Sequence, residues 1–590
     1  MTWSTYVNSY WDFWLIWVLA PCFLIIYGIK LINFNSISNQ LYPSSSPIKL
    51  DQNKGNLNNK NLIIFQIIFL LLLIFSYSLL ILYKEDFVGN DYSQITLFSL
   101  RGRLFGLPIW SHEGRFFPLG HQEFNLISLF TKTSFGYHLF PIFQIIVVVF
   151  SVFYIFTKEK INNKVLVIIL ILMTPSFVQS YFSLIIPERN LIFWLTLFIL
   201  FIQRFDSKKS LYNFIFIVTI SQFIIYYKEP SFLFISGFAL SRLLIKFIER
   251  QQTVKSIKNI INFIHQNWLE ISLLLLSALF VLLYIITILP NITSSYVEQR
   301  NELTRLMVLT KYLSFSPLLS IFLLTISSRI ILVSQSKIKF DLLWDSLAIG
   351  ALFYFLAYIV LNLYATYYLA PVDFIAILYC SIIADKFLNI NKYNSLILLF
   401  LITLLSSYQI YNSSYIIVTK KLFADGRIKA VEFIQKELKA EKYLDYTNLV
   451  FPGNRNYDVM EFSAFMNYKN IPLFPHKKYP SQSSMSSSIA MIKIQQKNPK
   501  DNCVPYISYL KCYYSPSLQI NDRIVILPQL PNGLLSEDIQ QFKDNYQLIY
   551  HYDPYSSDLQ WMIKILEYLH PLPDKWFELY IFKVAEKKAN

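Results

Sequence analysis

Apolar runs about as long as a bilayer is thick recur along this chain of 590 residues. The runs at 61–83, 271–290 and 396–417 each match the ~20 largely apolar residues that a helix needs to cross the hydrocarbon core. A water-soluble core rarely needs many segments of this length. The runs therefore predict an α-helical, polytopic integral membrane protein.

The composition agrees with this fold class. Hydrophobic residues make up 54% of the chain and charged residues 15%, and the mean hydropathy is +0.42. The formal net charge of +15 would suggest a nucleic-acid partner if the protein were soluble. Lys and Arg gathered on one side of a membrane explain the charge better. We therefore expect the lipid bilayer, and no nucleic acid, as a partner.

Twelve segments are candidate transmembrane helices. They lie at about 12–33, 61–83, 137–157, 164–183, 190–204, 211–227, 230–248, 268–290, 313–333, 344–364, 367–385 and 394–416. The first resembles a signal peptide only superficially, because no basic region precedes it and no small-residue cleavage site follows it. We interpret residues 1–60 as an extra N-terminal span and a cytoplasmic linker.

Basic residues concentrate in alternate connections between these segments. One set holds eighteen: Lys49, Lys54, Lys60, Lys158, Lys160, Lys164, Arg204, Lys208, Lys209, Arg242, Lys246, Arg250, Lys255, Lys258, Lys337, Lys339, Lys386 and Lys392. The opposite short loops hold five: Arg189, Lys228, Arg300, Arg305 and Lys311. The positive-inside rule puts the first set in the cytoplasm. The N-terminus, loop 84–136 and the tail are then expected outside. The amino-acid composition is of the kind that AT-rich genomes encode, which suggests a bacterial inner or plasma membrane.

The tail, residues 418–590, changes in character and predicts a small soluble α/β domain. Helical spacing covers 425–442, with Asp425 as its N-cap. Further elements are expected at 447–451, 523–528, 547–552 and 576–584 as strands, and at 535–546 as a helix. Cys503 and Cys512 could form a disulfide if the tail is exported, with two free thiols as the alternative.

Ionisable residues on the outer side carry the functional signal, because charges at membrane depth are costly. Loop 84–136 holds Glu85, Asp86 and Asp91 just after a span, and His112, Glu113 and Arg115 further on. A carboxylate there could deprotonate an acceptor hydroxyl, and an arginine could bind a phosphate leaving group. The alternative is a solvated loop with interfacial Arg and Tyr anchors.

Three short turns on the same side add to this cluster. They carry Glu188 and Arg189, then Lys228 and Glu229, then Tyr367 and Tyr368. Each turn is too short to stand away from the membrane, so its polar groups must lie at the lipid–water boundary. Together with loop 84–136 they could build a polar cavity open to the outer leaflet. The alternative for any one turn is a capped helix end.

In this combination the chain resembles the GT-C superfamily of polytopic glycosyltransferases, which includes protein O-mannosyltransferases and the aminoarabinose transferases of lipid A. The resemblance covers the membrane region, about 61–417. Members carry an acidic motif in the first large outer loop, where this chain has Asn90-Asp91-Tyr92, with Glu85-Asp86 shortly before. Later family motifs are similar to Gly114-Arg115-Phe116-Phe117-Pro118-Leu119, Pro187-Glu188-Arg189-Asn190, Lys228-Glu229-Pro230 and Tyr367-Tyr368-Leu369-Ala370-Pro371. Tyr367 stands where arginine is usual.

The resemblance implies an inverting transfer of a sugar from a polyprenyl phosphate to an envelope lipid, glycan or protein. Asp91 or Asp86 would be the general base, and the choice between them stays open. Arg115, Arg189 and Lys228 would bind the donor phosphate. Substrate contacts would fall to Glu85, His112, Glu113, Glu188, Glu229, Tyr367 and Tyr368. Such transferases often need no metal, and no residues here have clear metal-ligand spacing, although a divalent cation stays an open alternative.

Other functions compete with this interpretation. O-antigen polymerases and ligases usually place their catalytic loop late in the chain, whereas the largest loop here is early. Transporters, including flippases for lipid-linked glycans, favour charged or helix-breaking residues deep within spans. The mid-span regions here are nearly free of charge. A family member that has lost catalysis and acts as a scaffold would share all of these features.

Overall fold

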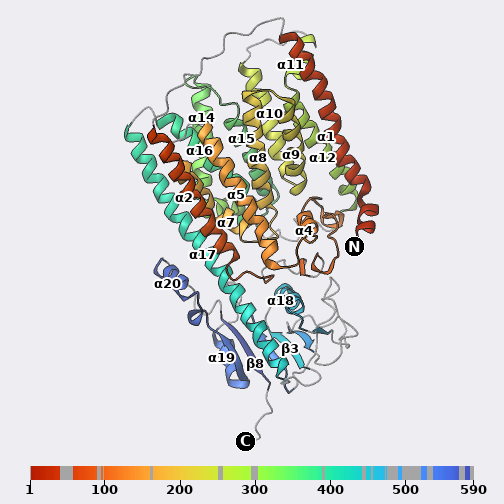
Figure 1. The fold of residues 1–590 in the computed structure, drawn as a ribbon, viewed down its shortest axis with the longest axis vertical. Coiled ribbons are helices and arrows are strands. Elements are labelled where there is room, and N and C mark those ends of the chain that lie inside the picture. Colours follow the sequence, from red (N-terminus) through yellow and green to blue (C-terminus); the bar gives the residue numbers. More distant parts are fainter. Residues whose placement is uncertain are drawn as a thin grey trace.

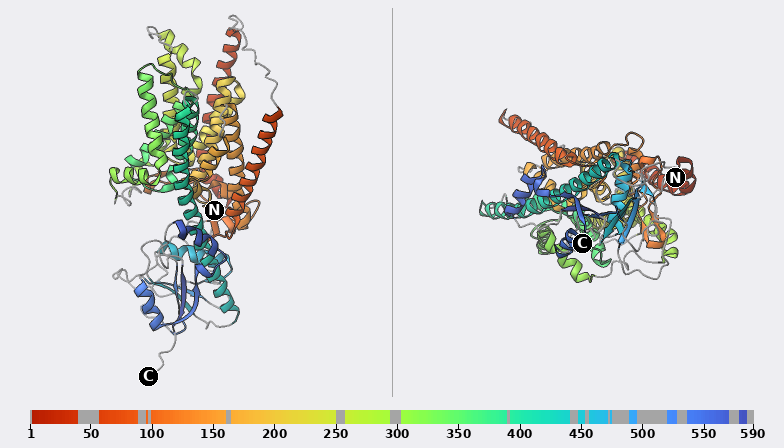
Figure 2. Two further views of the ribbon diagram at one scale, coloured as in Figure 1. Left: turned by 90° about the vertical axis from the view of Figure 1, so that its left-hand side faces the viewer. Right: turned by 90° about the horizontal axis from the view of Figure 1, so that it is seen from below.

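The structure is a computed structural model in which a long helical bundle stands on a smaller unit built around a β-sheet (Figure 1 and Figure 2). It describes residues 2–39, 57–88, 95–96, 99–159, 164–249, 257–293, 303–388, 392–440, 447–452, 456–471, 473–474, 489–494, 520–527, 536–569 and 578–584. The N-terminus, α4 and the sheet unit lie toward one end of the bundle, and α11 lies at the other (Figure 1).

The bundle consists of α1 (Trp3–Asn39), α2 (Leu57–Leu82), α4 (Gln122–Ile127), α5 (Ser134–Lys158), α6 (Lys164–Leu172), α7 (Pro175–Tyr181), α8 (Glu188–Ser207), α9 (Leu211–Tyr227), α10 (Ser231–Glu249), α11 (Ile257–Gln266), α12 (Trp268–Thr287), α13 (Arg305–Phe315), α14 (Pro317–Ser334), α15 (Trp344–Val360), α16 (Ala370–Leu388) and the first part of α17 (Lys392–Lys439). Short 3-10 turns interrupt it at η1 (Ser99–Arg101), η2 (Ser111–Glu113), η3 (Leu289–Asn291) and η5 (Thr366–Leu369).

Eight helices within the described residues are long and apolar enough to cross a bilayer. They are Trp3–Ile29, Asn61–Leu82, Ser134–Lys158, Glu188–Ser207, Ser231–Ile248, Trp268–Asn291, Pro317–Ser334 and Thr366–Asp385. The pair α6 and α7, bent by 63°, would make a ninth, and α9 and α15 are shorter apolar helices. The chain thus has the helical, apolar architecture expected of a multi-pass membrane protein, while the total of twelve spans stays a prediction.

Helix starts follow local chemistry. The side chains of Thr133, Ser210 and Thr304 each accept a hydrogen bond from a backbone N–H in the first turn of α5, α9 and α13. Pro175 opens α7, where a proline suits the first helical position because its missing N–H would have no partner in the helix. The bend between α6 and α7 falls immediately before it.

The predicted break between a last span at 394–416 and a tail helix at 425–442 is wrong. Helix α17 runs through both over 48 residues and carries the chain from the bundle into the sheet unit. Asp425 is therefore no N-cap. Its carboxylate accepts hydrogen bonds from Lys84 at 3.0 Å and from the Tyr552 hydroxyl at 2.9 Å. Gly426 leaves room for the Tyr552 ring, which a Cβ there would approach to 3.0 Å.

The C-terminal unit contains a six-stranded sheet in the order β4-β5-β3-β6-β8-β7. Its elements are β3 (Thr447–Pro452), α18 (Asn456–Tyr468), β4 (Leu473–Phe474), β5 (Ile489–Ile494), β6 (Arg523–Ile526), α19 (Ser536–Asn545), β7 (Gln547–Tyr552), η7 (Pro554–Ser556), α20 (Gln560–Leu569) and β8 (Leu579–Lys583). Only the β3–β6 pair is parallel among the described strands. The predicted strands at 447–451, 523–528, 547–552 and 576–584 and the helix at 535–546 are confirmed as elements, whereas Cys503 and Cys512 lie outside the described residues.

Candidate functional site

A small hairpin in the first long loop presents Arg115. Strand β1 (Ile109–Trp110) pairs with β2 (Arg115–Phe116), and Gly114 closes the turn with a φ of +73°, a conformation that glycine adopts without strain. The guanidinium of Arg115 lies over the Phe117 ring at 4.7 Å. The Tyr284 hydroxyl donates to the Gly114 carbonyl at 3.1 Å, which ties the hairpin to α12. The loop is thus held against the bundle rather than free in solvent.

Arg115 pairs with Glu229 in the turn between α9 and α10. Arg115 Nε donates to Glu229 Oε1 at 2.6 Å, and the Phe116 N–H donates to the same oxygen at 3.3 Å. Burial alone would raise the pKa of Glu229, but the charges of Arg115 and Lys228 outweigh it and lower that pKa. The carboxylate is therefore ionised at neutral pH and holds the guanidinium in place.

Lys228, the preceding residue, forms a second ion pair. Its Nζ lies 3.2 Å from Glu188 Oε1 at the start of α8, and 4.8 Å from the centroid of the Tyr368 ring. The Tyr368 ring in turn stacks on Tyr358 of α15 with centroids 4.4 Å apart. Three turns far apart in the sequence therefore meet at this lysine, which brings the candidate residues Glu188, Lys228 and Tyr368 together.

A cavity of about 530 Å³ opens beside these pairs. Its charged end is formed by Glu113, Arg115, Lys228 and Glu229, with Tyr284, Tyr358 and Tyr368 beside them. Its other walls are apolar and come from α10, α12 and α15: Phe232, Leu233, Phe280, Val281, Phe353, Leu356 and Val360. The volume lies within the range of small-molecule sites. The arrangement suits a ligand with an anionic group at one end and hydrocarbon at the other.

Arg189 lies in different surroundings. Its side chain is fully buried, donates from Nη1 to the Leu184 carbonyl at 2.7 Å and lies 3.3 Å from a carboxylate oxygen of Glu123. Asn190 donates to the same carboxylate at 2.7 Å and accepts from Gln144 at 2.7 Å. Arg189 does not line the cavity beside Arg115, and its contacts hold loop 84–136 to α8.

His121 also lies near the site, although it is not among the candidate residues that the sequence indicated. It is buried, with a left-handed φ of +64°, and its Nδ1 has no hydrogen-bond partner among the described residues. Burial, followed by the charges of Lys228, Arg189 and Arg115, lowers the pKa of His121 to about 3. The imidazole is therefore neutral at physiological pH and adds no further positive charge near Arg115, Lys228 and Arg189.

Glu85 and Asp86 lie at the junction with the C-terminal unit. Lys421 of α17 donates to Glu85 Oε1 at 2.8 Å, and His138 Nε2 lies 3.5 Å from the other oxygen. Burial opposes ionisation of Glu85, but Lys421 and His138 more than offset it and lower its pKa to about 2. Asp86 pairs with Lys469 of the sheet unit. Both carboxylates thus connect the loop to the tail and do not line the cavity beside Arg115.

The other predicted site residues are more dispersed. Asp91 lies outside the described residues. His112 is exposed on η2, where its carbonyl accepts from the Thr293 N–H at 3.2 Å. Tyr367 lies edge-on to Tyr368, with centroids 4.7 Å apart, but does not line the cavity. In the described parts of the chain no group of three or more His, Cys, Asp and Glu is placed to hold a metal ion.

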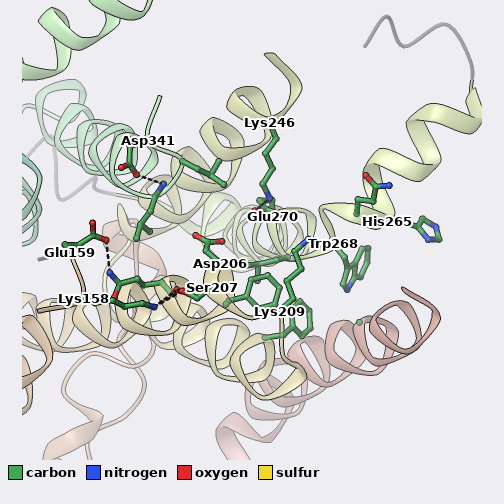
Figure 3. A pocket seen from close by; sticks show the side chains of 18 residues that line it. Lys158, Glu159, Asp206, Ser207, Lys209, Lys246, His265, Trp268, Glu270 and Asp341 are labelled. Atoms are coloured by element: carbon green, nitrogen blue, oxygen red, sulfur yellow. Dashed lines mark hydrogen bonds and ion pairs between the residues drawn. The ribbon is translucent and has the colours of Figure 1, made fainter. Parts of the chain in front are cut away.

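A second cavity of about 620 Å³ lies at the opposite end of the bundle, lined by residues from the ends of α5, α8, α10 and α12 (Figure 3). Arg242 donates to both carboxylate oxygens of Asp206, at 2.9 and 2.6 Å, and to Glu270 at 2.8 Å. Lys246 donates to the same Glu270 oxygen at 2.6 Å. These opposite charges neutralise one another and join α8, α10 and α12.

The two cavities therefore differ in kind. The one near Arg115 combines hydrocarbon walls with an end that carries two cations and two carboxylates, and it brings together Glu113, Arg115, Lys228, Glu229 and Tyr368 of the predicted site. The one near Arg242 is polar and internally paired. The chain matches no protein-family model, no curated protein and no solved structure.

Proposed function

We propose that this protein is a membrane glycosyltransferase that moves a sugar from a polyprenyl phosphate to an envelope lipid, glycan or protein. The observation that carries the proposal is the cavity beside Arg115, where apolar walls end at two cations that carboxylates hold in place. A polyprenyl phosphate has that same division, a long hydrocarbon chain and a phosphate. The resemblance to GT-C enzymes, whose motifs include Arg115, Lys228 and Tyr368 at this cavity, supports the same donor class.

The apolar walls would hold the first part of the hydrocarbon chain. Phe280 of α12 and Leu356 of α15 lie on the walls of the cavity, and Phe232 of α10 completes them. Burying hydrocarbon there is favourable by about 25 cal/mol per Å² of surface removed from water. The rest of a chain this long would extend into the bilayer, which provides the same environment.

The cations would hold the phosphate. Arg115 and Lys228 line the same end of the cavity, and both are kept in position by carboxylates, Glu229 and Glu188. A guanidinium and an ammonium fixed before the donor arrives need little reorganisation as negative charge develops on the leaving phosphate. Glu229 and Glu188 are positioning residues in this account, since they orient the cations and do not contact the reacting atoms.

The transfer would then be a single displacement. The acceptor oxygen attacks C1 of the sugar, the bond between C1 and the phosphate oxygen breaks, and polyprenyl phosphate leaves with the bonding pair. The proton of the acceptor hydroxyl passes to a carboxylate, for which Asp91 is the choice. Asp86 is less suited because Lys469 pairs with it at the junction with the tail. One displacement inverts the configuration at C1.

The end of the bundle that carries the cavity beside Arg115 supports a reaction at the outer face of the membrane. The N-terminus, α4 and the C-terminal unit lie toward that end (Figure 1). Lys158, Lys209 and Lys246, which belong to the basic set expected in the cytoplasm, line the cavity at the other end (Figure 3). A flipped donor, with its sugar on the outer leaflet, would meet an envelope acceptor there. The C-terminal unit would help to position that acceptor.

The test is a transfer assay in membranes with a panel of radiolabelled polyprenyl-phosphate sugars. We expect Arg115→Ala and Asp91→Asn to lower the rate by about 10²–10³-fold. Arg103→Ala is the matched control, since Arg103 is exposed in the same loop and lines neither cavity. A wild-type protein that transfers sugar from none of the donors would refute the enzyme class. Full activity of Asp91→Asn would refute the choice of base alone.

A further inference from the structure

Helix α20 of the C-terminal unit lies against the bundle rather than on the sheet alone. Leu559, Met562, Ile563 and Leu566 are buried and belong to the same continuous hydrophobic cluster as the membrane helices, including Leu422 of α17. Asp558, just before α20, pairs with Lys84 at 3.0 Å, two residues beyond the end of α2. The helix therefore sits at the level where α2 leaves the apolar part of the bundle (Figure 1).

The exposed side of α20 is apolar as well. Trp561 is 58% exposed, Ile565 53% and Tyr568 92%. At 100° per residue these three side chains form one stripe, since they are spaced four and three residues apart. Gln560, Lys564 and Glu567 form a polar strip that lies between Tyr568 of this stripe and Ile563 of the buried face. The helix thus has a buried face, an exposed apolar stripe beside it, and a narrow polar strip.

Single exposed apolar residues are ordinary, but a stripe of three on one helix marks a contact surface. The neighbouring surface indicates what covers it. Phe75 and Leu79 near the end of α2 are also exposed, as expected of side chains that face lipid. Lys84 joins the end of α2 to the start of α20, so the stripe continues an apolar surface that a bilayer covers.

We infer that α20 is an interfacial helix whose stripe of Trp561, Ile565 and Tyr568 inserts among the lipid headgroups beside α2. Trp and Tyr are the side chains that favour this zone, because their rings are apolar and their N–H or O–H groups meet water. The polar strip of Lys564 and Glu567 faces the aqueous side, as in helices that lie in a membrane surface. The contact gives the C-terminal unit a second attachment to the membrane besides its covalent link through α17, and it does not depend on the proposed reaction.

The experiment places an environment-sensitive fluorophore on single cysteines in the full chain, with Cys22, Cys380, Cys503 and Cys512 replaced by alanine. Ile565→Cys reports on the stripe, and Lys564→Cys is the matched control one residue away on the polar strip. Gln540→Cys, exposed on α19, reports on the part of the unit away from the bundle. The labelled chains are reconstituted in lipid vesicles with and without lipids that carry a nitroxide near the headgroup.

We expect the label at 565 to show blue-shifted emission and to lose most of its intensity to the nitroxide lipid. The labels at 564 and 540 should stay red-shifted and respond instead to aqueous iodide. Iodide quenching at 565 equal to that at 564 would overturn the inference. So would a label at 565 that is shielded from iodide yet insensitive to the nitroxide lipid, because a protein partner or a second copy would then cover the stripe.

Discussion

Arg115 and Arg189 have the same charge and lie near the same turns, but they have different surroundings. Arg115 lines a cavity and is held on one side by Glu229, whereas Arg189 is fully buried among Glu123 and backbone carbonyls. A guanidinium in the first position can meet a ligand, and one in the second stabilises the fold. This difference separates two residues that the sequence assigned to the same task.

Arg189→Ala should therefore lower stability. Removing one partner of a buried ion pair leaves an uncompensated charge on Glu123 and costs about 3–5 kcal/mol. Arg115→Ala should lower sugar transfer with a much smaller change in the unfolding temperature, because that site is open to the cavity. Thermal unfolding of both variants in the same detergent makes the comparison. An Arg189→Ala protein as stable as the exposed-loop variant Arg103→Ala would contradict the structural role.

The lowered pKa of Glu85 should make the stability of the fold depend on pH. Its pKa falls from 4.5 to about 2 on folding, because Lys421 and His138 outweigh the effect of burial. A carboxyl with a lowered folded pKa stabilises the fold above its unfolded pKa, and this contribution is lost as the pH falls toward the folded pKa. The shift corresponds to about 3 kcal/mol. Unfolding measured from pH 6 to pH 3 should show stability declining in the wild type below about pH 4.5, and a flatter profile in Glu85→Gln. Parallel profiles would contradict the ion pair.

At the scale of elements, the apolar runs were enough to predict the helices, because a span needs little beyond length and hydrophobicity. The cavity walls could not be predicted the same way. Phe280 and Leu356 lie in spans where an apolar side chain can face lipid, core or cavity, and helix rotation decides which. Likewise Asp425 suggested the start of a separate helix, whereas it lies within α17 and its carboxylate accepts hydrogen bonds from Lys84 and Tyr552. Such roles depend on partners far away in the sequence.

The packing of α10 on α15 shapes the cavity and offers a test at this scale. A Cβ on Gly350 would lie 2.8 Å from the backbone carbonyl oxygen of Phe234, so the helices would have to move apart. We expect Gly350→Ala to cost about 1–3 kcal/mol of stability and to reduce transfer. Gly237→Ala is the control, because the three atoms nearest to its Cβ belong to the Phe353 side chain, at 3.1–3.2 Å, and none of them to a backbone. Equal unfolding temperatures for the two variants would argue against close packing at Gly350.

At the scale of the whole molecule, the two ends of the bundle differ in their connections. One end carries the hairpin with Arg115, the junction of Glu85 with α17, and the C-terminal unit. The other carries the ion pairs around Arg242 and the basic residues Lys158, Lys209 and Lys246. Membrane insertion responds to that asymmetry, since basic loops stay in the cytoplasm. The sequence predicts an orientation from counts of charge alone, without side-chain contacts, and that orientation stays a prediction.

The polarity predicts which residues a reagent outside the cell can reach. Single cysteines at Arg103 in the first loop and Gln540 in α19 should react with a membrane-impermeant maleimide in intact cells. A cysteine at Lys209, exposed at the opposite end, should react only after the membrane is permeabilised. Labelling of Lys209→Cys in intact cells, with protection of the other two, would reverse the orientation and move the cavity to the cytoplasmic side.

The most direct test of the central claim is to locate the bound lipid. A polyprenyl phosphate with a photoreactive group near the phosphate would be crosslinked to the purified chain in lipid nanodiscs, and the labelled peptides identified. We predict labelling of α12 and α15 around Phe280 and Leu356, competed by unlabelled polyprenyl phosphate but not by the matching polyprenol, and strongly reduced by Arg115→Ala with Lys228→Ala. Equal competition by the polyprenol, or labelling around the Arg242 cavity instead, would contradict the account.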